Sequence, residues 1–112
     1  MPTVSSVMTK NPVVCVVPGN VESVVKTLTK RGLTGMPVVN ADGKYAGVIS
    51  RRDIFSNHEE AQTAMVMRSP LPVKDDEDVS VAAEQMVDQG KRHIVVVDAH
   101  IGVLSRYVLL YR

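Results

Sequence analysis

The chain has 112 residues, a net charge of +1 and 22% charged residues. This length suits one ordinary domain, or two very small ones that share a core. The near-neutral charge argues against a dedicated nucleic-acid-binding protein, because such proteins usually carry a strong basic excess. Apolar residues make up 45% of the sequence and aromatic residues only 4%, so we expect a core of aliphatic side chains.

The single cysteine, Cys15, cannot form a disulfide within the chain, so the protein is not built around oxidising chemistry. The N-terminus lacks the positive start and apolar run of a secretory signal. No apolar stretch approaches the roughly 20 residues that span a bilayer. We therefore predict a cytoplasmic protein, or a fragment excised from a larger one.

The first half of the chain begins with a strand and a helix. We expect an extended segment at residues 13–17, followed by Asn20 as an N-cap that accepts a free amide of the helix start. Gly32 stands where a left-handed C-cap ends the helix. Apolar residues at i, i+3, i+4 and i+7 predict one buried face, made of Val21, Val24, Val25 and Leu28.

A hairpin and a closing helix complete the first half. Strands are expected at residues 36–39 and 45–49, joined through Asp42 and Gly43, a pair typical of tight turns. Ser50 is a plausible cap of the closing helix. The polar residues 56–63 predict a solvated helix that links the two halves.

The second half repeats this pattern at an offset of 58 residues, and at an offset of 55 after a three-residue deletion. Asp78 replaces Asn20 as the cap, and strands are expected at residues 94–97 and 101–104. Neither half can bury its sheet and helix alone at this size, so we expect the halves to pack together with clefts where they meet. The matched positions include Pro12 with Pro70, Val21 with Val79, Leu28 with Met86, Gly32 with Gly90 and Gly47 with Gly102.

This order of elements resembles the CBS domain, twice, over essentially the whole chain. The resemblance is carried by residues 7–12, 36–40 and 47–54 in the first half, and by residues 66–70, 95–98 and 102–105 in the second. Each motif is weak alone, but the order and spacing of all of them are specific.

The resemblance implies an α/β (α+β) fold, with one β-α-β-β-α repeat at residues 1–57 and another at 58–112, packed about a pseudo-twofold axis. It also implies a regulatory module with two clefts that often pairs into a homodimer. Such modules bind AMP, ADP, ATP or S-adenosyl compounds and signal to an attached or partner protein, for example in energy sensing. For this chain we expect AMP first.

The family's ligand motif is matched by residues 47–53. The resemblance assigns the Asp53 carboxylate to the ribose hydroxyls, which it can bind through two charge-assisted hydrogen bonds. Ser50 and the helix start suit the phosphate, which Arg51 or Arg52 can also reach. The alternative is that Asp53 only complements the helix dipole as an acid in the first turn.

In the family, the other wall of this cleft comes from the second repeat. The resemblance places the adenine against Ser69, Pro70, Leu71 and Val73. Basic residues before the next strand would bind phosphate, and Arg92 or His93 fits that role. The alternative is that Lys91 and Arg92 only favour the end of a helix.

The second cleft departs from the family pattern. Its serine is present as Ser105, but Val108 stands at the position of the acid. We therefore expect this cleft to be weak, empty or differently occupied, and predict one nucleotide per chain.

Catalytic chemistry is not expected. The sequence lacks the GxSxG, GxxxxGK[ST], HExxH and CxxC motifs, and its three histidines are not spaced as metal ligands. Cys15 is expected to be an inert core thiol. We predict no enzyme activity, no metal and no catalytic cofactor, and leave open a dimerisation module without ligand and, less favoured, a nucleic-acid binder.

Apolar residues of the closing helices predict self-association. An uncovered apolar face on so small a protein usually marks an interface, so we expect a twofold homodimer. The residues concerned are Ile54, Phe55, Val108, Leu109 and Leu110.

Overall fold

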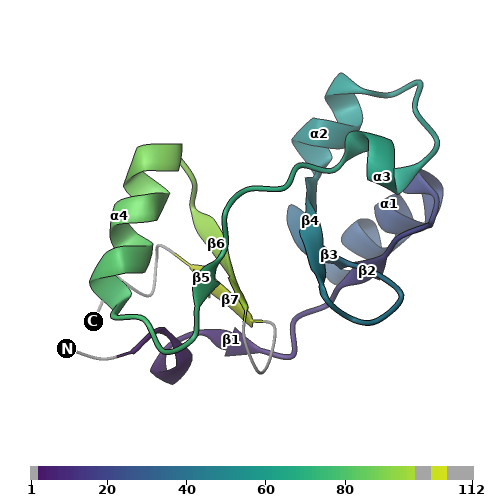
Figure 1. The fold of residues 1–112 in the computed structure, drawn as a ribbon. Helices are drawn as coiled ribbons and strands as arrows, with labels where there is room; N and C mark the ends of the chain where they lie inside the picture. The colour runs from purple at the N-terminus through teal and green to yellow at the C-terminus, as the bar shows by residue number, and fades with distance from the viewer. Residues whose placement is uncertain (1–2, 98–101, 106–112) are drawn as a thin grey trace. The chain divides into compact units, whose positions relative to one another are not determined.

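The computed structural model describes residues 3–97 and 102–105 and divides into two compact units (Figure 1). The first-repeat unit is Val13–Pro70, and the second-repeat unit combines Met1–Pro12 with Leu71–Arg112. The N-terminal segment belongs to the second-repeat unit because strand β1 (Thr9–Lys10) pairs with β7 (Gly102–Ser105). The segment after the predicted boundary at 57 and 58 belongs to the first-repeat unit, where Gln62 pairs with Asn20 and Arg68 with Val48. That boundary, and the pseudo-twofold packing of the repeats, stay predictions.

The first-repeat unit holds a three-stranded sheet in the order β2-β3-β4. Strand β2 runs parallel to β3, while β3 and β4 form the predicted antiparallel hairpin. The linking helix predicted at residues 56–63 is wrong: the chain turns after α2, and a short α3 begins only at Thr63. The elements are β2 (Cys15–Val16), α1 (Val21–Arg31), β3 (Gly35–Val39), β4 (Tyr45–Ser50), α2 (Arg51–Ser56) and α3 (Thr63–Val66).

Helix α1 forms as its caps predict. The Asn20 side chain accepts a hydrogen bond from the Ser23 amide at 2.8 Å, and Gly32 ends the helix at φ 66°. Residues with side chains are strained at such a positive φ, which glycine adopts freely. The predicted apolar face is buried except for Val25, which is 40% exposed. The buried face of α1 is therefore narrower than the spacing of its apolar residues predicted.

The second-repeat unit holds a four-stranded sheet in the order β1-β7-β6-β5. Its helix α4 is capped by Asp78, which accepts from the Ser80 amide, and ends at Gly90 at φ 63°. The closing helix predicted after Ser105 lies outside the described residues. The elements are η1 (Val4–Ser6), β1 (Thr9–Lys10), β5 (Val73–Lys74), α4 (Val79–Gln89), β6 (His93–Val97) and β7 (Gly102–Ser105).

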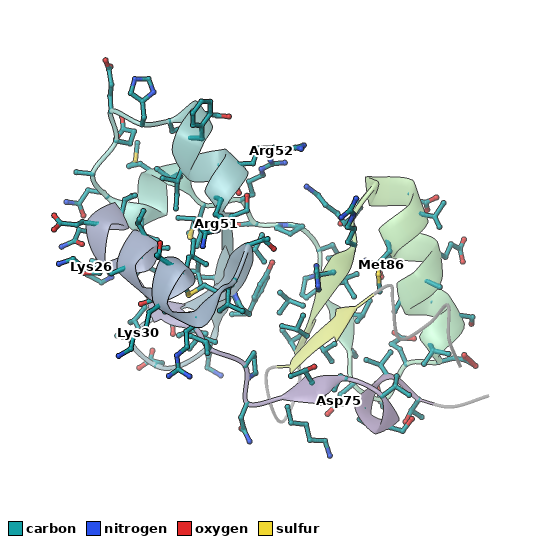
Figure 2. All side chains as sticks on the ribbon, turned by 180° about the vertical axis from the view of Figure 1, so that it is seen from behind. Lys26, Lys30, Arg51, Arg52, Asp75 and Met86 are labelled. Atoms are coloured by element: carbon teal, nitrogen blue, oxygen red, sulfur yellow. The ribbon has the colours of Figure 1, made fainter. Side chains whose placement is uncertain are left out.

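The two cores use the same repeat positions. Leu28 of α1 packs against Val38 of β3, and the residues 58 positions later, Met86 of α4 and Val96 of β6, pack together in the other unit. Figure 2 shows Met86 between α4 and its sheet. Both units therefore follow one plan, and the predicted repeat and α/β fold are confirmed. Among the described residues, no helix has the length and apolar character needed to cross a membrane.

Candidate functional site

The predicted ligand motif begins at Gly47 on β4, where another part of the chain comes very close. A Cβ atom at Gly47 would collide with the carbonyl oxygen of Arg68 and lie 3.2 Å from Ser69 Oγ. The absence of a side chain therefore lets the segment around Arg68 lie directly against β4.

Hydrogen bonds hold this segment along β4. The Val48 amide donates to the Arg68 carbonyl at 2.7 Å, and the Arg68 amide donates back at 2.9 Å. Ser69 Oγ donates to the Ala46 carbonyl at 2.9 Å, and Tyr45 Oη donates to the Pro70 carbonyl at 2.7 Å. Two residues of the predicted adenine wall, Ser69 and Pro70, thus lie beside the motif within one unit.

Ser50 and Asp53 form a reciprocal cap at the junction of β4 and α2. The Asp53 amide donates to Ser50 Oγ at 3.2 Å, while the Ser50 amide donates to Asp53 Oδ2 at 3.1 Å. Ser50 Oγ also donates to that oxygen at 2.8 Å. Both side chains therefore satisfy each other, and Asp53 is only 6% exposed. The structural role that the sequence left open for Asp53 is present.

The other Asp53 oxygen is held by Arg68, a residue that the sequence did not assign to this site. Arg68 Nε donates to Asp53 Oδ1 at 2.6 Å. The signal was weak: a basic residue follows Val66-Met67 where threonine follows Val7-Met8 in the first repeat. That difference between the repeats does not predict a pairing of Arg68 with Asp53, because the two residues lie 15 positions apart in sequence.

The two arginines that open α2 differ in their surroundings. Arg51 Nε donates to the Leu33 carbonyl at 2.7 Å, which ties the side chain to the loop before β3. Arg52 has no side-chain hydrogen bond within the described part of the chain. Figure 2 labels both side chains at the start of α2, with Arg52 extending outward from the helix.

The remaining predicted site residues belong to the second-repeat unit. Leu71 is 71% exposed, while Val73 is buried in the core of that unit at 3% exposure. Arg92 precedes β6 and His93 begins it, both exposed. The Val73 side chain therefore packs in the core of its unit and does not face a ligand, whereas the side chains of Arg92 and His93 are exposed and accessible to one.

The sequence matches the CBS domain at residues 4–60 and again at residues 63–111. The chain belongs to the CBS domain family. CBS domain pairs are ligand-binding regulatory modules rather than a family of catalysts. The predicted family is thus confirmed by both halves of the chain.

Solved structures of CBS proteins match nearly the whole chain. CBSX2, in complex with AMP, is 26% identical with a TM-score of 0.89, covering 99% of this chain and 95% of that one. A CBS protein of unknown function from Thermoplasma acidophilum, TA0289, is 26% identical with a TM-score of 0.83, covering 98% of this chain and 68% of that one.

A more distant match is the CBS domain pair of MJ0100, in complex with 5′-methylthioadenosine and S-adenosyl-L-methionine. It is 20% identical with a TM-score of 0.85, covering 99% of this chain and 94% of that one, and at that identity it shows the fold alone. The comparison with curated proteins gave no match.

The second CBS motif is described only in part. Ser105 ends β7, and Val108 lies outside the described residues. The expected weakness of that cleft, and the expectation of one nucleotide per chain, therefore stay predictions. In residues 3–97 and 102–105, no cluster of three or more His, Cys, Asp or Glu side chains is placed to hold a metal ion.

A pocket that the sequence did not predict lies between β2 and the start of α1. It measures about 270 Å³ and is lined by Cys15, Asn20, Ser23, Thr27 and Thr63, among others. Thr63 Oγ1 is buried there without a hydrogen-bond partner in the described structure. Burial raises the pKa of the Cys15 thiol, so less of it is thiolate at a given pH. The expected inertness of this thiol stays a prediction.

Proposed function

We propose that this chain is a regulatory module that binds an adenine nucleotide, AMP first and ADP or ATP as related ligands, at the CBS motif around Ser50 and Asp53. The observation that carries the proposal is the AMP complex of CBSX2, because that protein matches 99% of this chain at 26% identity. The motif itself supports it, with glycine, serine and aspartate at the family's spacing.

The first-repeat unit contributes the better defined half of the site. In the proposal, Asp53 accepts hydrogen bonds from the ribose, and the backbone of the Ser69-Pro70 segment beside β4 serves the adenine. The Arg68–Pro70 segment makes four hydrogen bonds to β4, two with Val48, one with Ala46 and one with Tyr45, so it is preorganised rather than ordered by the ligand.

The other predicted contacts are assigned by family resemblance. In the proposal, the basic side chains bind the phosphate, and the start of the segment at Leu71 makes an apolar contact with the adenine. These residues are Arg51, Arg52, Leu71, Arg92 and His93. The side chain of Val73, which the sequence also assigned to the adenine, is buried in the core of its unit and is left out of the proposal.

The test is calorimetry of the full chain with AMP, ADP, ATP, S-adenosylmethionine and NAD. A ligand present at 100 times its dissociation constant should also stabilise the fold by about 2.7 kcal/mol in thermal unfolding. Asp53→Asn keeps the size of the side chain but removes its charge, and should weaken AMP binding by about tenfold or more. Asp42→Asn, in the exposed hairpin turn, is the matched control and should leave the affinity unchanged.

Other outcomes would support the alternatives. Preference for S-adenosylmethionine would change the ligand but keep the site, provided that Asp53→Asn weakens it. Absence of binding to all five compounds would leave a dimerisation module as the better description. Tight binding to DNA that falls by about 0.9 log units per log unit of salt for each neutralised phosphate would mark a nucleic-acid binder.

The proposal includes a homodimer that signals to a partner protein in the cytoplasm. Its support is an apolar side chain on α2: Phe55 is 83% exposed, as expected of an interface residue. Sedimentation at tens of micromolar should give a dimer that Phe55→Glu dissociates. A monomeric wild-type protein would contradict this part of the proposal.

A further inference from the structure

The Asp53 carboxylate is already held by three hydrogen-bond donors. Oδ2 accepts from the Ser50 amide and hydroxyl, at 3.1 and 2.8 Å, and Oδ1 accepts from Arg68 Nε at 2.6 Å. The Asp53 side chain is only 7% exposed in this arrangement. Because so little of this side chain is exposed, a ligand hydroxyl gains access to the carboxylate where one of the present donors moves away.

Of these donors, Arg68 is the one that can leave. The Ser50 donors are part of the cap at the start of α2, so their loss would disturb the junction of β4 and α2. The Arg68 side chain is instead 52% exposed, and it is attached to a backbone segment that has its own hydrogen bonds to β4. It can rotate into solvent without moving that segment, as long basic side chains do.

A released Arg68 would remain close to the ligand. Only its Nε takes part in the bond to Asp53, and within the described residues no protein group accepts from its Nη atoms. A guanidinium group matches the geometry of phosphate oxygens through paired N–H donors. A 5′-phosphate is attached to the same sugar ring whose hydroxyls would have taken Asp53, so it lies within reach of this side chain.

We infer that Arg68 determines ligand specificity by competing with the ribose for Asp53 and then pairing with the phosphate. An uncharged nucleoside displaces Arg68 from Asp53 and provides no anionic partner in return. A nucleotide also displaces Arg68 from the carboxylate, but its phosphate then pairs with the guanidinium group. Arg68 thus disfavours adenosine and favours AMP. The inference rests on the proposed function and adds to it a residue that the family motif does not contain.

Calorimetry with AMP and adenosine tests this on the full chain. Wild-type protein should bind AMP about tenfold or more tightly than adenosine, the effect of one hydrogen bond between charged groups. Arg68→Met keeps the length of the side chain but removes its donors. This variant should bind adenosine severalfold more tightly than wild type and AMP more weakly, so that the ratio of the two affinities falls toward one.

Two further variants control the experiment. Arg31→Met removes an exposed arginine at the end of α1 and should leave both affinities unchanged. Arg68→Lys keeps the charge but not the paired donors, and should restore part of the preference for AMP. If Arg68→Met lacks a cooperative unfolding transition, Arg68→Gln takes its place. Glutamine removes the charge that pairs with phosphate but keeps one donor for Asp53, so it should weaken AMP binding and leave adenosine binding near the wild-type value, and the ratio of the two affinities should still fall.

The outcomes separate this inference from the proposed function. If wild-type protein binds AMP and Arg68→Met keeps the same ratio of affinities, or loses adenosine binding, the role of Arg68 is refuted and the nucleotide site stands. If neither wild type nor variant binds AMP or adenosine at millimolar concentration, both are refuted.

Discussion

Replacing Gly47 by alanine should detach the Arg68–Pro70 segment from β4. The new Cβ atom would collide with the Arg68 carbonyl oxygen, and because that atom is backbone, the whole segment must shift. Three hydrogen bonds depend on this approach, two between Val48 and Arg68 and one between Ser69 and Ala46. At about 1 kcal/mol for each hydrogen bond, their loss lowers the free energy of unfolding by about 3 kcal/mol. Alanine also reduces the conformational entropy of the unfolded chain, which brings the net destabilisation to about 2–2.5 kcal/mol.

Urea denaturation followed by circular dichroism measures this cost. Ser69→Ala is the matched control, because it removes only the side-chain bond and should cost about 1 kcal/mol. In a thermal scan Gly47→Ala should melt roughly 8–10 °C below wild type, at about 4 °C per kcal/mol for a chain of this size. A Gly47→Ala protein within about 0.5 kcal/mol of wild type would show that the close approach does not hold the segment.

Two further predictions concern the core of the first-repeat unit. Leu28→Ala should lower the free energy of unfolding in urea by about 3–5 kcal/mol, because Leu28 is 1% exposed and its truncation leaves a cavity. Val25→Ala, on the exposed side of α1, should change it by no more than about 0.5 kcal/mol. Equal effects of the two substitutions would contradict the assignment of the buried face. Because burial raises the pKa of Cys15, less thiolate is present at any given pH in the folded protein. Alkylation by iodoacetamide should therefore reach half its maximal rate at a higher pH in the folded protein than in 8 M urea. A midpoint at or below that of the unfolded protein would refute the burial argument.

Most helices and strands of this protein were predictable because the residues that begin and end them act over a few positions in sequence. The cap at Asn20 and the left-handed Gly32 act within one helical turn, and their repetition at Asp78 and Gly90 predicted a second copy of the same unit. Ser50 was predictable as a cap for the same reason, whereas the ligand motif that contains Ser50 and Asp53 was implied by family resemblance. Family resemblance then added a nucleotide as the expected ligand.

Tertiary structure decided what occupies the Asp53 carboxylate. The pairing with Arg68 depends on the close approach that Gly47 permits, and no spacing in the sequence encodes a contact between segments that meet only after folding. The exposure of Val25 had the same origin: helical periodicity predicts which side chains share a face, but only the position of the sheet decides how wide a face it covers.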